Sequence, residues 1–281
     1  MIEFDRFTKQ YRDFHLDISM EIPDNRVVGI IGRNGCGKST TIKAILGLVK
    51  PTSGSVKVFG REARELTPRD KERIGAALSD SMFSSLLSVE DVRAILKAMY
   101  RNFDEPFFRE MCGRLNLPLR KRLKDFSTGM KAKVRILAAI SHQADLLILD
   151  EPTAGLDVEA RNEIISFLKE YACDNSRTIL ITSHISADLE GLCDEFHLFS
   201  EGRVLLHETA GNIGKRYGTV QIPFEMFETI DKTCISGYRK ETFGYACITN
   251  NREHFEERYP EIKVKPAGID DFIALIGGAE E

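Results

Sequence analysis

The 281-residue sequence predicts an α/β fold built on a mostly parallel sheet. Three short apolar runs, at residues 27–32, 145–150 and 177–184, are rich in β-branched residues and typical of strands that are buried on both faces. Helical patterns follow the first run at 38–49 and the second at 158–172. Strands that alternate with helices favour parallel pairing through right-handed crossovers.

The other regions add smaller elements to this sheet. Residues 55–60 predict a further strand, and residues 194–208 predict a hairpin whose turn is Glu201-Gly202. Residues 88–143 look mainly helical, with breaks near Pro106 and Pro118. After about residue 210 no chemical motif is evident, and a short helical pattern at 268–278 closes the chain, which indicates a small appended subdomain.

Composition narrows the class of protein. Hydrophobic residues make up 42% and charged residues 29%, as in an ordinary globular protein, and the net charge of −4 argues against a nucleic-acid partner. The six cysteines form no CxxC pair, which favours reduced thiols over a zinc cluster. The first residues lack the apolar core of a signal peptide, and no apolar run reaches 18 residues, so we do not expect this chain to cross a membrane.

A phosphate-binding loop is the strongest motif. The stretch GRNGCGKST fits G-x-x-x-x-G-K-[ST] between a predicted strand and a predicted helix. Gly35 and Gly37 allow successive N–H groups to point at an anion, Lys38 would reach the β- and γ-phosphates, and Ser39 would bind Mg²⁺. The predicted nucleotide-binding residues are Gly32, Arg33, Asn34, Gly35, Cys36, Gly37, Lys38, Ser39 and Thr40.

Cys36 lies inside this loop and admits two interpretations. The positive surroundings could lower the pKa of its thiol and make it reactive. The favoured interpretation is that Cys36 is a small residue that fills space.

An acidic pair follows the second buried strand. In LLILDEP, Asp150 stands at the carboxyl end of the strand, where ligands of open α/β sheets bind. We expect Asp150 to hold Mg²⁺ through water, and Glu151 to act as the general base on an attacking water. Lys38 and Glu151 are therefore the first two catalytic candidates.

A second anion-binding patch is present at FSTGM, where Ser127 and Gly129 begin a predicted helix. The ordered set of motifs resembles the ATP-binding-cassette (ABC) ATPases of the exporter type over residues 1 to about 210; these motifs are GRNGCGKST, FSTGMKAKVRI, LLILDEP, AGLD and ITSH. The resemblance implies a P-loop NTPase core with an antiparallel β edge, a helical subdomain at about 80–143, and a small C-terminal subdomain at 211–281.

The resemblance also implies roles for single residues. Ser127 and Gly129 would complete the nucleotide site of a second cassette in a head-to-tail dimer, and Asp157 would lie in the loop that communicates across it. His184 resembles the switch histidine that contacts the γ-phosphate, which makes it the third catalytic candidate. Tyr11 resembles the aromatic residue that stacks on adenine.

One family element is replaced. The glutamine that normally follows the strand at 73–78 is absent, and the letters there are Ser79 and Asp80. We expect Asp80 to take over the metal contact through a Mg²⁺-bound water, because Mg²⁺ favours carboxylate oxygens. The alternative is that Asp80 is merely solvated.

The function that the resemblance implies is ATP binding and hydrolysis in a dimeric transporter subunit at the inner face of the cell membrane. The cofactors would be ATP and Mg²⁺, and the partners a second ABC ATPase subunit and a separate integral-membrane permease, with export as the expected direction. Residues 80–100 would contact the permease, although the core face of a helix explains their apolar spacing equally well. The rival functions are a soluble cassette that acts on ribosomes or DNA and a regulatory cassette with weak turnover.

Overall fold

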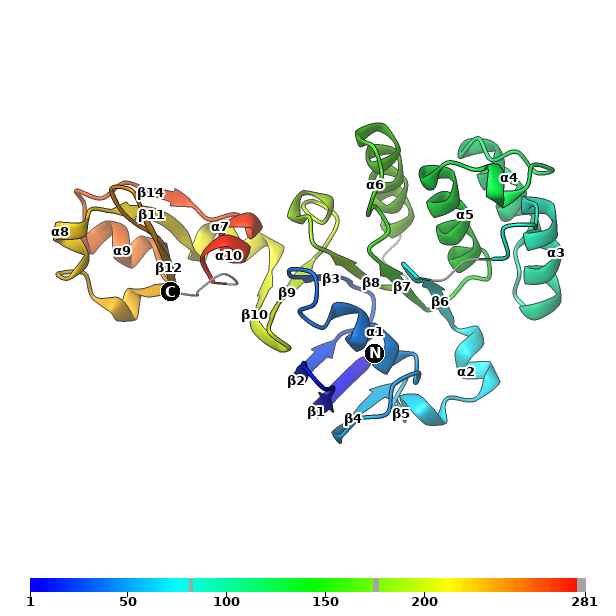
Figure 1. The fold of residues 1–281 in the computed structure, drawn as a ribbon, viewed down its shortest axis with the longest axis horizontal. Coiled ribbons are helices and arrows are strands. Elements are labelled where there is room, and N and C mark those ends of the chain that lie inside the picture. Colours follow the sequence, from blue (N-terminus) through cyan, green and yellow to red (C-terminus); the bar gives the residue numbers. More distant parts are fainter. Residues whose placement is uncertain (81–82, 174–176, 277–281) are drawn as a thin grey trace.

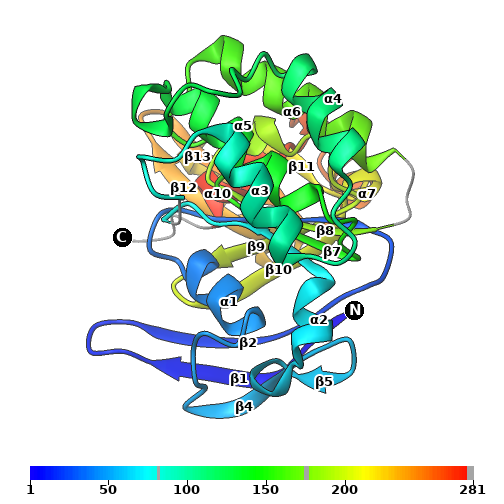
Figure 2. The same cartoon turned by 90° about the vertical axis from the view of Figure 1, so that its right-hand side faces the viewer.

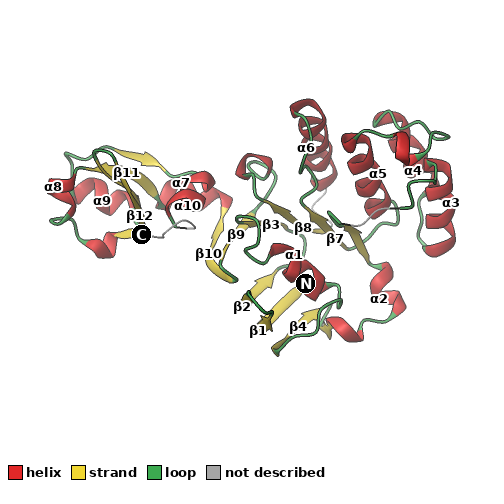
Figure 3. Ribbon diagram, viewed as in Figure 1, coloured by secondary structure: helices red, strands yellow, loops and turns green. Residues whose placement is uncertain are grey.

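The computed structural model describes residues 1–80, 83–173 and 177–276. Within these ranges, a six-stranded sheet crosses the larger part of the molecule in the order β10-β9-β3-β8-β7-β6 (Figures 1 and 3). The strands β3, β6, β7, β8 and β9 are parallel, and β10 is antiparallel to β9, so the predicted α/β class is confirmed. The bounds are β3 Val27–Ile31, β6 Ile74–Ala77, β7 Leu146–Asp150, β8 Thr178–Ser183, β9 Glu195–Ser200 and β10 Arg203–Thr209.

The three central strands carry the site. Every residue of β3, β7 and β8 is buried, as their apolar sequences predict for strands that are covered on both faces. Their carboxyl ends are in register, because Ile31 pairs with Ser183 and Asp150 pairs with Thr182. Residues that directly follow β3, β7 and β8 therefore emerge at one edge of the sheet.

A smaller antiparallel sheet covers one side of this layer. Its order is β2-β1-β4-β5, and β2 alternates strictly between exposed and buried residues. Helix α1 (Lys38–Ile45) lies between the two sheets (Figure 2) and shares one apolar cluster with both of them. The strand bounds are β1 Ile2–Gln10, β2 His15–Ile22, β4 Ser53–Val58 and β5 Arg61–Glu62.

Helix α1 ends earlier than the predicted range of 38–49. Gly47, two residues after its last residue, adopts φ 69°, a left-handed conformation that stops a helix. A Cβ on Gly47 would lie 2.5 Å from the carbonyl oxygen of Ala63, so the packing also requires glycine there.

Helices cover the opposite face of the parallel sheet (Figure 2). They share one large apolar cluster with it, and the prediction of a mainly helical segment at 88–143 is confirmed. Pro106 lies in the first turn of α4, where Asp104 caps the helix by accepting from the N–H of Phe107 at 2.9 Å. The helices are α2 Pro68–Glu72, which lies beside β6, and α3 Val89–Met99, α4 Glu105–Arg114, α5 Thr128–Ile140 and α6 Val158–Ala172.

The predicted hairpin forms between β9 and β10. Glu201 and Gly202 have φ 45° and 78°, as a tight hairpin turn requires. A Cβ on Gly202 would lie 1.9 Å from the carbonyl oxygen of His15, so only glycine fits against β2.

The C-terminal part carries a sheet that the sequence does not predict. Residues 218–266 form an antiparallel sheet in the order β12-β13-β11-β14, at the far left of Figure 1. One face packs on α8 and α9 in a small apolar cluster, and the other joins α7 and α10 in the large cluster of the core. The elements are α7 Ala210–Arg216, β11 Gly218–Ile222, α8 Phe224–Phe227, β12 Ile235–Glu241, β13 Gly244–Thr249, α9 Arg252–Arg258, β14 Val264–Pro266 and α10 Ile269–Leu275.

The last predicted helix is present as α10, and residues 277–278 of its predicted range lie outside the described residues. The division of the chain at residue 210 stays a prediction. Among the described helices, none is both long and apolar enough to span a lipid bilayer.

Candidate functional site

The phosphate loop joins β3 to α1 at the edge where the central strands end. Gly35 and Gly37 have φ 84° and 112°, which side chains larger than hydrogen rarely adopt. A Cβ on Gly37 would lie 2.7 Å from Leu16 Cδ1, whereas a Cβ on Gly35 would meet no atom within 4 Å. The loop is therefore held by packing at Gly37 and open at Gly35, as a cradle for an anion requires.

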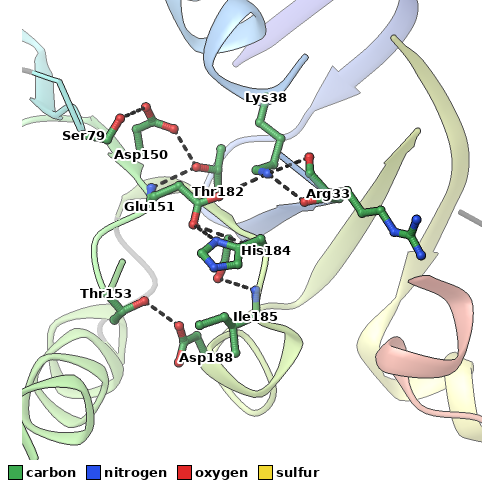
Figure 4. Close-up of polar contacts among 12 residues, drawn as sticks. Arg33, Lys38, Ser79, Asp150, Glu151, Thr153, Thr182, His184, Ile185 and Asp188 are labelled. Carbon is green, nitrogen blue, oxygen red and sulfur yellow. Dashed lines mark hydrogen bonds and ion pairs between the residues drawn. The ribbon is translucent and has the colours of Figure 1, made fainter. Parts of the chain in front are cut away.

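Lys38 is the centre of this loop. Its side chain is 5% exposed, and its amino group donates to the carbonyl oxygens of Gly32 at 2.7 Å and Arg33 at 3.2 Å. It also forms an ion pair with Glu151 Oε1 at 3.1 Å (Figure 4). The ammonium group is thus fixed inside the loop and pointed at the first residue after β7.

The other loop residues differ in exposure. Arg33, Asn34 and Gly35 are exposed, and Ser39 and Thr40 are half-buried in the first turn of α1. Cys36 is buried, and burial raises the pKa of its thiol even though the charge of Lys38 acts to lower it. The interpretation of Cys36 as a reactive thiolate is therefore wrong, and the space-filling interpretation agrees with its packing.

The buried carboxylate of Asp150 accepts hydrogen bonds from three hydroxyl groups. Thr182 donates to its Oδ1 at 2.8 Å, Ser79 to its Oδ2 at 2.8 Å, and Ser39 to the same Oδ2 at 3.2 Å. Asp150 is 3% exposed, and no ion pair joins it to a cation in the part of the chain that the structure describes. A buried charge normally has a counter-charge, and hydroxyl and carboxylate oxygens are the ligands that Mg²⁺ prefers, so this donor set fits a magnesium ion.

Glu151 and His184 meet beside Lys38. Glu151 has φ 48° and donates its N–H to Thr182 Oγ1 at 3.0 Å, which turns its side chain toward the loop. His184, the residue after β8, has Nδ1 2.6 Å from Glu151 Oε2, and its N–H donates to the same oxygen at 3.3 Å. The structure thus brings all three predicted catalytic residues into one contiguous network (Figure 4).

Asp80 does not join this network. Its carboxylate accepts from Lys43 Nζ at 2.9 Å, and the two side chains are 60% and 40% exposed. The hydrogen bond from Lys43 lowers the pKa of Asp80. It is Ser79 that contacts Asp150, a role that the sequence interpretation did not give to this serine.

Tyr11 lies beside a second aromatic ring, that of Phe14. It is 41% exposed, its ring centroid is 6.3 Å from that of Phe14, and Lys9 Nζ is 5.3 Å from its ring centroid. A Cβ on Gly37 would lie 3.1 Å from Phe14 Cζ, so this aromatic pair borders the phosphate loop. The sequence interpretation missed Phe14.

The predicted second anion-binding patch lies at two adjacent helix starts. Ser127 caps α5 by accepting from the N–H of Met130 at 3.2 Å, and Asp157 caps α6 by accepting from the N–H of Ala160 at 2.9 Å. A Cβ on Gly129 would lie 2.9 Å from the Cβ of Ala160, so the two helices approach closely at this glycine. Among the described residues, no hydrogen bond or ion pair joins this patch to the phosphate loop.

Asp188 is a supporting residue that the sequence does not reveal. Its carboxylate is 2% exposed and accepts from the Thr153 hydroxyl and from Arg161 Nε. The bond from Thr153 ties the loop between β7 and α6 to the segment after His184 (Figure 4), and the bond from Arg161 ties α6 to the same segment. No sequence motif could have found Asp188, because its partners are 27 and 35 residues away.

Comparisons with known proteins identify the family of this chain. A family model described as "ABC transporter" matches residues 16–154. The chain is 33% identical over 222 residues to the bacitracin transport ATP-binding protein BcrA of Enterococcus faecalis, covering 77% of this chain and 71% of that protein. It is 34% identical over 212 residues to the lantibiotic transport ATP-binding protein SrtF of Streptococcus pyogenes, covering 74% and 90%.

A solved structure described as the ATP binding subunit of an ABC transporter superposes with a TM-score of 0.67 at 27% identity, covering 75% of this chain and 91% of that one. The identity to two curated relatives exceeds 30% over more than two thirds of each chain. The chain therefore belongs to the ABC transporter ATP-binding proteins and is an ATP-hydrolysing subunit of such a transporter.

Proposed function

We propose that this subunit binds ATP with Mg²⁺ in the loop at 32–40, and that hydrolysis of this ATP drives export through a separate membrane permease. The observation that carries the proposal is the junction of Lys38, Asp150, Glu151 and His184 at the ends of three adjacent strands. The relatives named for bacitracin and lantibiotic transport support export as the direction.

The roles of the site residues follow from their contacts. In the proposal, Lys38 turns from Glu151 to the phosphates, since a triphosphate offers more negative charge than one carboxylate. Glu151, released from that ion pair, accepts a proton from the attacking water, and His184 stays within reach of the γ-phosphate. Ser39 and Asp150 would hold Mg²⁺, which supplies charge neutralisation of the phosphate oxygens.

The Tyr11–Phe14 pair is the proposed base platform. Stacking on an aromatic face requires no hydrogen-bond pattern and tolerates either purine. Its position beside Gly37 agrees with a base that extends from phosphates held in the loop.

A head-to-tail dimer is the proposed assembly. Ser127 and Gly129 lie at a helix start, where backbone N–H groups can bind an anion. Within the described residues, no carboxylate accepts from these N–H groups. In the proposal, they bind the γ-phosphate held by a second subunit, and Asp157 lies beside them at the same interface. Such an interface is isologous, so each subunit completes the site of the other.

The proposed permease contact lies at the edge of the helical region, at the inner face of the cell membrane. Within the predicted coupling segment, Val89, Val92 and Leu96 of α3 are core residues, whereas Leu86 and Met99 are 64% and 62% exposed; residues 81 and 82 lie outside the described residues. A pocket of about 240 Å³ opens at Leu96 in this segment and could receive an apolar side chain. Its lining includes Ala76, Phe83, Leu96, Tyr100, Arg135 and His142.

The test uses Glu151→Gln in the full-length protein. We expect this variant to bind ATP, to lose about 10²–10⁴ of its hydrolysis rate, and to run as a dimer in size-exclusion chromatography only when ATP and Mg²⁺ are present. Glu253→Gln on the exposed face of α9 is the matched control and should behave as the wild type. An active Glu151→Gln variant, or one that stays monomeric with ATP, would contradict the proposed base and the dimer.

A further inference from the structure

Two residues outside the predicted catalytic set lie next to the Asp150 carboxylate. Ser79, the second residue after β6, donates its hydroxyl to Asp150 Oδ2 at 2.8 Å. Arg135, in the middle of α5, donates from Nη1 to the carbonyl oxygen of Leu78 at 3.1 Å and to that of Ser79 at 3.0 Å. A chain of contacts thus runs from α5 through the 78–79 backbone to Asp150.

We propose that Ser79 is a positioning residue that orients the Asp150 carboxylate for a metal ion, and that Arg135 holds Ser79 in place. The proposal rests on the proposed function, because it requires that Asp150 and Ser39 bind the metal of a nucleotide complex. Neither residue takes the metal contact that the sequence interpretation gave to Asp80, because both act through Asp150.

The hydrogen bonds around Asp150 support an orienting role. Thr182 holds Oδ1 and Ser79 holds Oδ2, both at 2.8 Å, so rotation of the carboxylate would break at least one of two short bonds. The bonds from Ser39, at 3.2 and 3.4 Å, are longer and leave that hydroxyl free to turn toward a cation. Without Ser79, Oδ2 would keep only the longer bond from Ser39.

The environment of Arg135 supports a fixed position. Its guanidinium is half-buried, and burial lowers the pKa of Arg135 while the nearby charge of Asp150 raises it. An arginine stays charged under any such shift, so its donors remain directed at the two carbonyl oxygens. Because Arg135 belongs to the helix that starts at Ser127, the position of Ser79 depends on the position of α5.

The neighbouring residue provides a matched control. Asp80 is one position further along the same segment, but its carboxylate pairs with Lys43 and is 60% exposed. A general effect of mutating this segment would appear at both positions, whereas an effect on the orientation of Asp150 would appear only at Ser79, which of the two is the residue that contacts Asp150.

The experiment measures metal affinity directly. Binding of Mn²⁺, as the probe for the metal, is followed by electron paramagnetic resonance on the full-length protein saturated with a non-hydrolysable ATP analogue. Ser79→Ala should weaken Mn²⁺ binding about tenfold, as the loss of a partner of a metal ligand typically does, and Ser79→Thr should restore it. The metal-free affinity for the analogue should stay at the wild-type value, because the hydroxyl acts only on the metal-binding carboxylate.

The arginine is tested in the same assay. Arg135→Met should weaken Mn²⁺ binding in the same direction, and the double variant with Ser79→Ala should be no weaker than Ser79→Ala alone, within about twofold, because Arg135 acts through Ser79. If circular dichroism shows that Arg135→Met does not fold, Arg135→Lys takes its place. Lysine is shorter and donates from one nitrogen, so the Mn²⁺ affinity of this variant should lie between those of the wild type and Ser79→Ala.

Three results would overturn the proposal: an unchanged Mn²⁺ affinity in Ser79→Ala, an equal loss in Asp80→Ala, or additive losses for Ser79 and Arg135. Failure of the proposed function has a different signature. In that case the wild-type protein itself would show no nucleotide-dependent Mn²⁺ binding.

Discussion

The edge of the parallel sheet that carries the site buries charged side chains, whereas the C-terminal antiparallel sheet buries almost only apolar ones. At the site edge, Lys38 and Asp150 are almost fully buried and the carboxylate of Glu151 is 12% exposed. Within the described residues from 218 onward, Thr249 is the one buried polar side chain, and the apolar cluster under β11–β13 contains no charge. Buried charges are costly unless they are paired, so their concentration in one place marks where chemistry occurs.

Strand direction explains why the two sheets differ. Parallel strands bring residues that are far apart in sequence to one edge, so Lys38, Ser79, Asp150 and His184 converge from four segments. Antiparallel hairpins pair residues that are near in sequence, as with Tyr238 and Cys247 of β12 and β13. We infer that substitutions at the site edge change catalysis, whereas those in the C-terminal sheet change stability.

The largest expected effect tests whether the site edge is completed by a second subunit. Lys38→Ala and Ser127→Arg should each reduce ATP hydrolysis about a hundredfold or more, since each removes a group that stabilises charge on the phosphates. An equimolar mixture should recover up to about a quarter of the wild-type rate, because half of the dimers then contain one intact site of two. Steady-state hydrolysis of the mixture, with heterodimers verified by two affinity tags, measures this; no recovery in verified heterodimers would show that Ser127 does not act in trans.

A stability effect is expected in the C-terminal sheet. Phe255 of α9 is fully buried, and Phe255→Ala should lower the free energy of unfolding by about 3–5 kcal/mol. Its hydrolysis rate below the unfolding transition should equal that of the wild type, since no residue of the site contacts this cluster. Urea unfolding and an activity assay on the same sample decide this, and a large loss of activity in folded protein would break the contrast between the two sheets.

A pH effect is expected inside the parallel sheet but away from its site edge. His197 of β9 is 1% exposed and stacks on His207 at 4.3 Å between ring centroids. Burial, and secondarily the charge of His207, lowers the pKa of His197 to about 3. The unfolded chain, with an ordinary histidine, therefore binds a proton as the pH falls below about 6.5 while the folded chain does not, so stability falls with pH.

Between pH 6.5 and 5 this histidine should cost the folded state about 2 kcal/mol, and His197→Leu should remove that part of the pH dependence. Urea unfolding at both pH values measures the difference. His207→Asn, at a partly exposed ring that pairs with Glu195 at 2.9 Å, is the control that should retain the acid sensitivity assigned to His197. Equal pH dependence in His197→Leu and the wild type would refute the assignment.

The smallest effect is expected at the tip of the C-terminal sheet. Phe243, in the turn between β12 and β13, is 89% exposed, so Phe243→Ala should change the free energy of unfolding by less than about 0.5 kcal/mol. Its hydrolysis rate should match the wild type. A larger loss of stability would show that this turn packs against a second molecule in solution, which a concentration series of the unfolding midpoint would detect.

Much of the site could be predicted because its motifs are local. The phosphate loop needs glycines at two positive-φ positions before a helix, and Asp150-Glu151 needs only the end of an apolar strand; both requirements can be read from a few consecutive residues. Contacts across the sheet could not be read in this way. The side chain next to Asp150 is Ser79 and not the adjacent carboxylate of Asp80, because Lys43 of α1 pairs with Asp80.

By itself, then, the sequence determined the α/β class, the order of the parallel strands along the chain, the phosphate loop and the identity of the three catalytic candidates. The reason is that backbone conformation and burial on both faces leave local signatures in residue type and spacing. Only the tertiary structure decided that Thr182 and Ser79 contact Asp150, that Arg135 holds the backbone at Ser79, that Phe14 lies beside Tyr11, and that residues 218–266 form their own sheet. These contacts depend on which side chains meet across strands and helices. The sequence around a serine, an arginine or a weakly patterned strand does not show which partner it will contact in the folded chain.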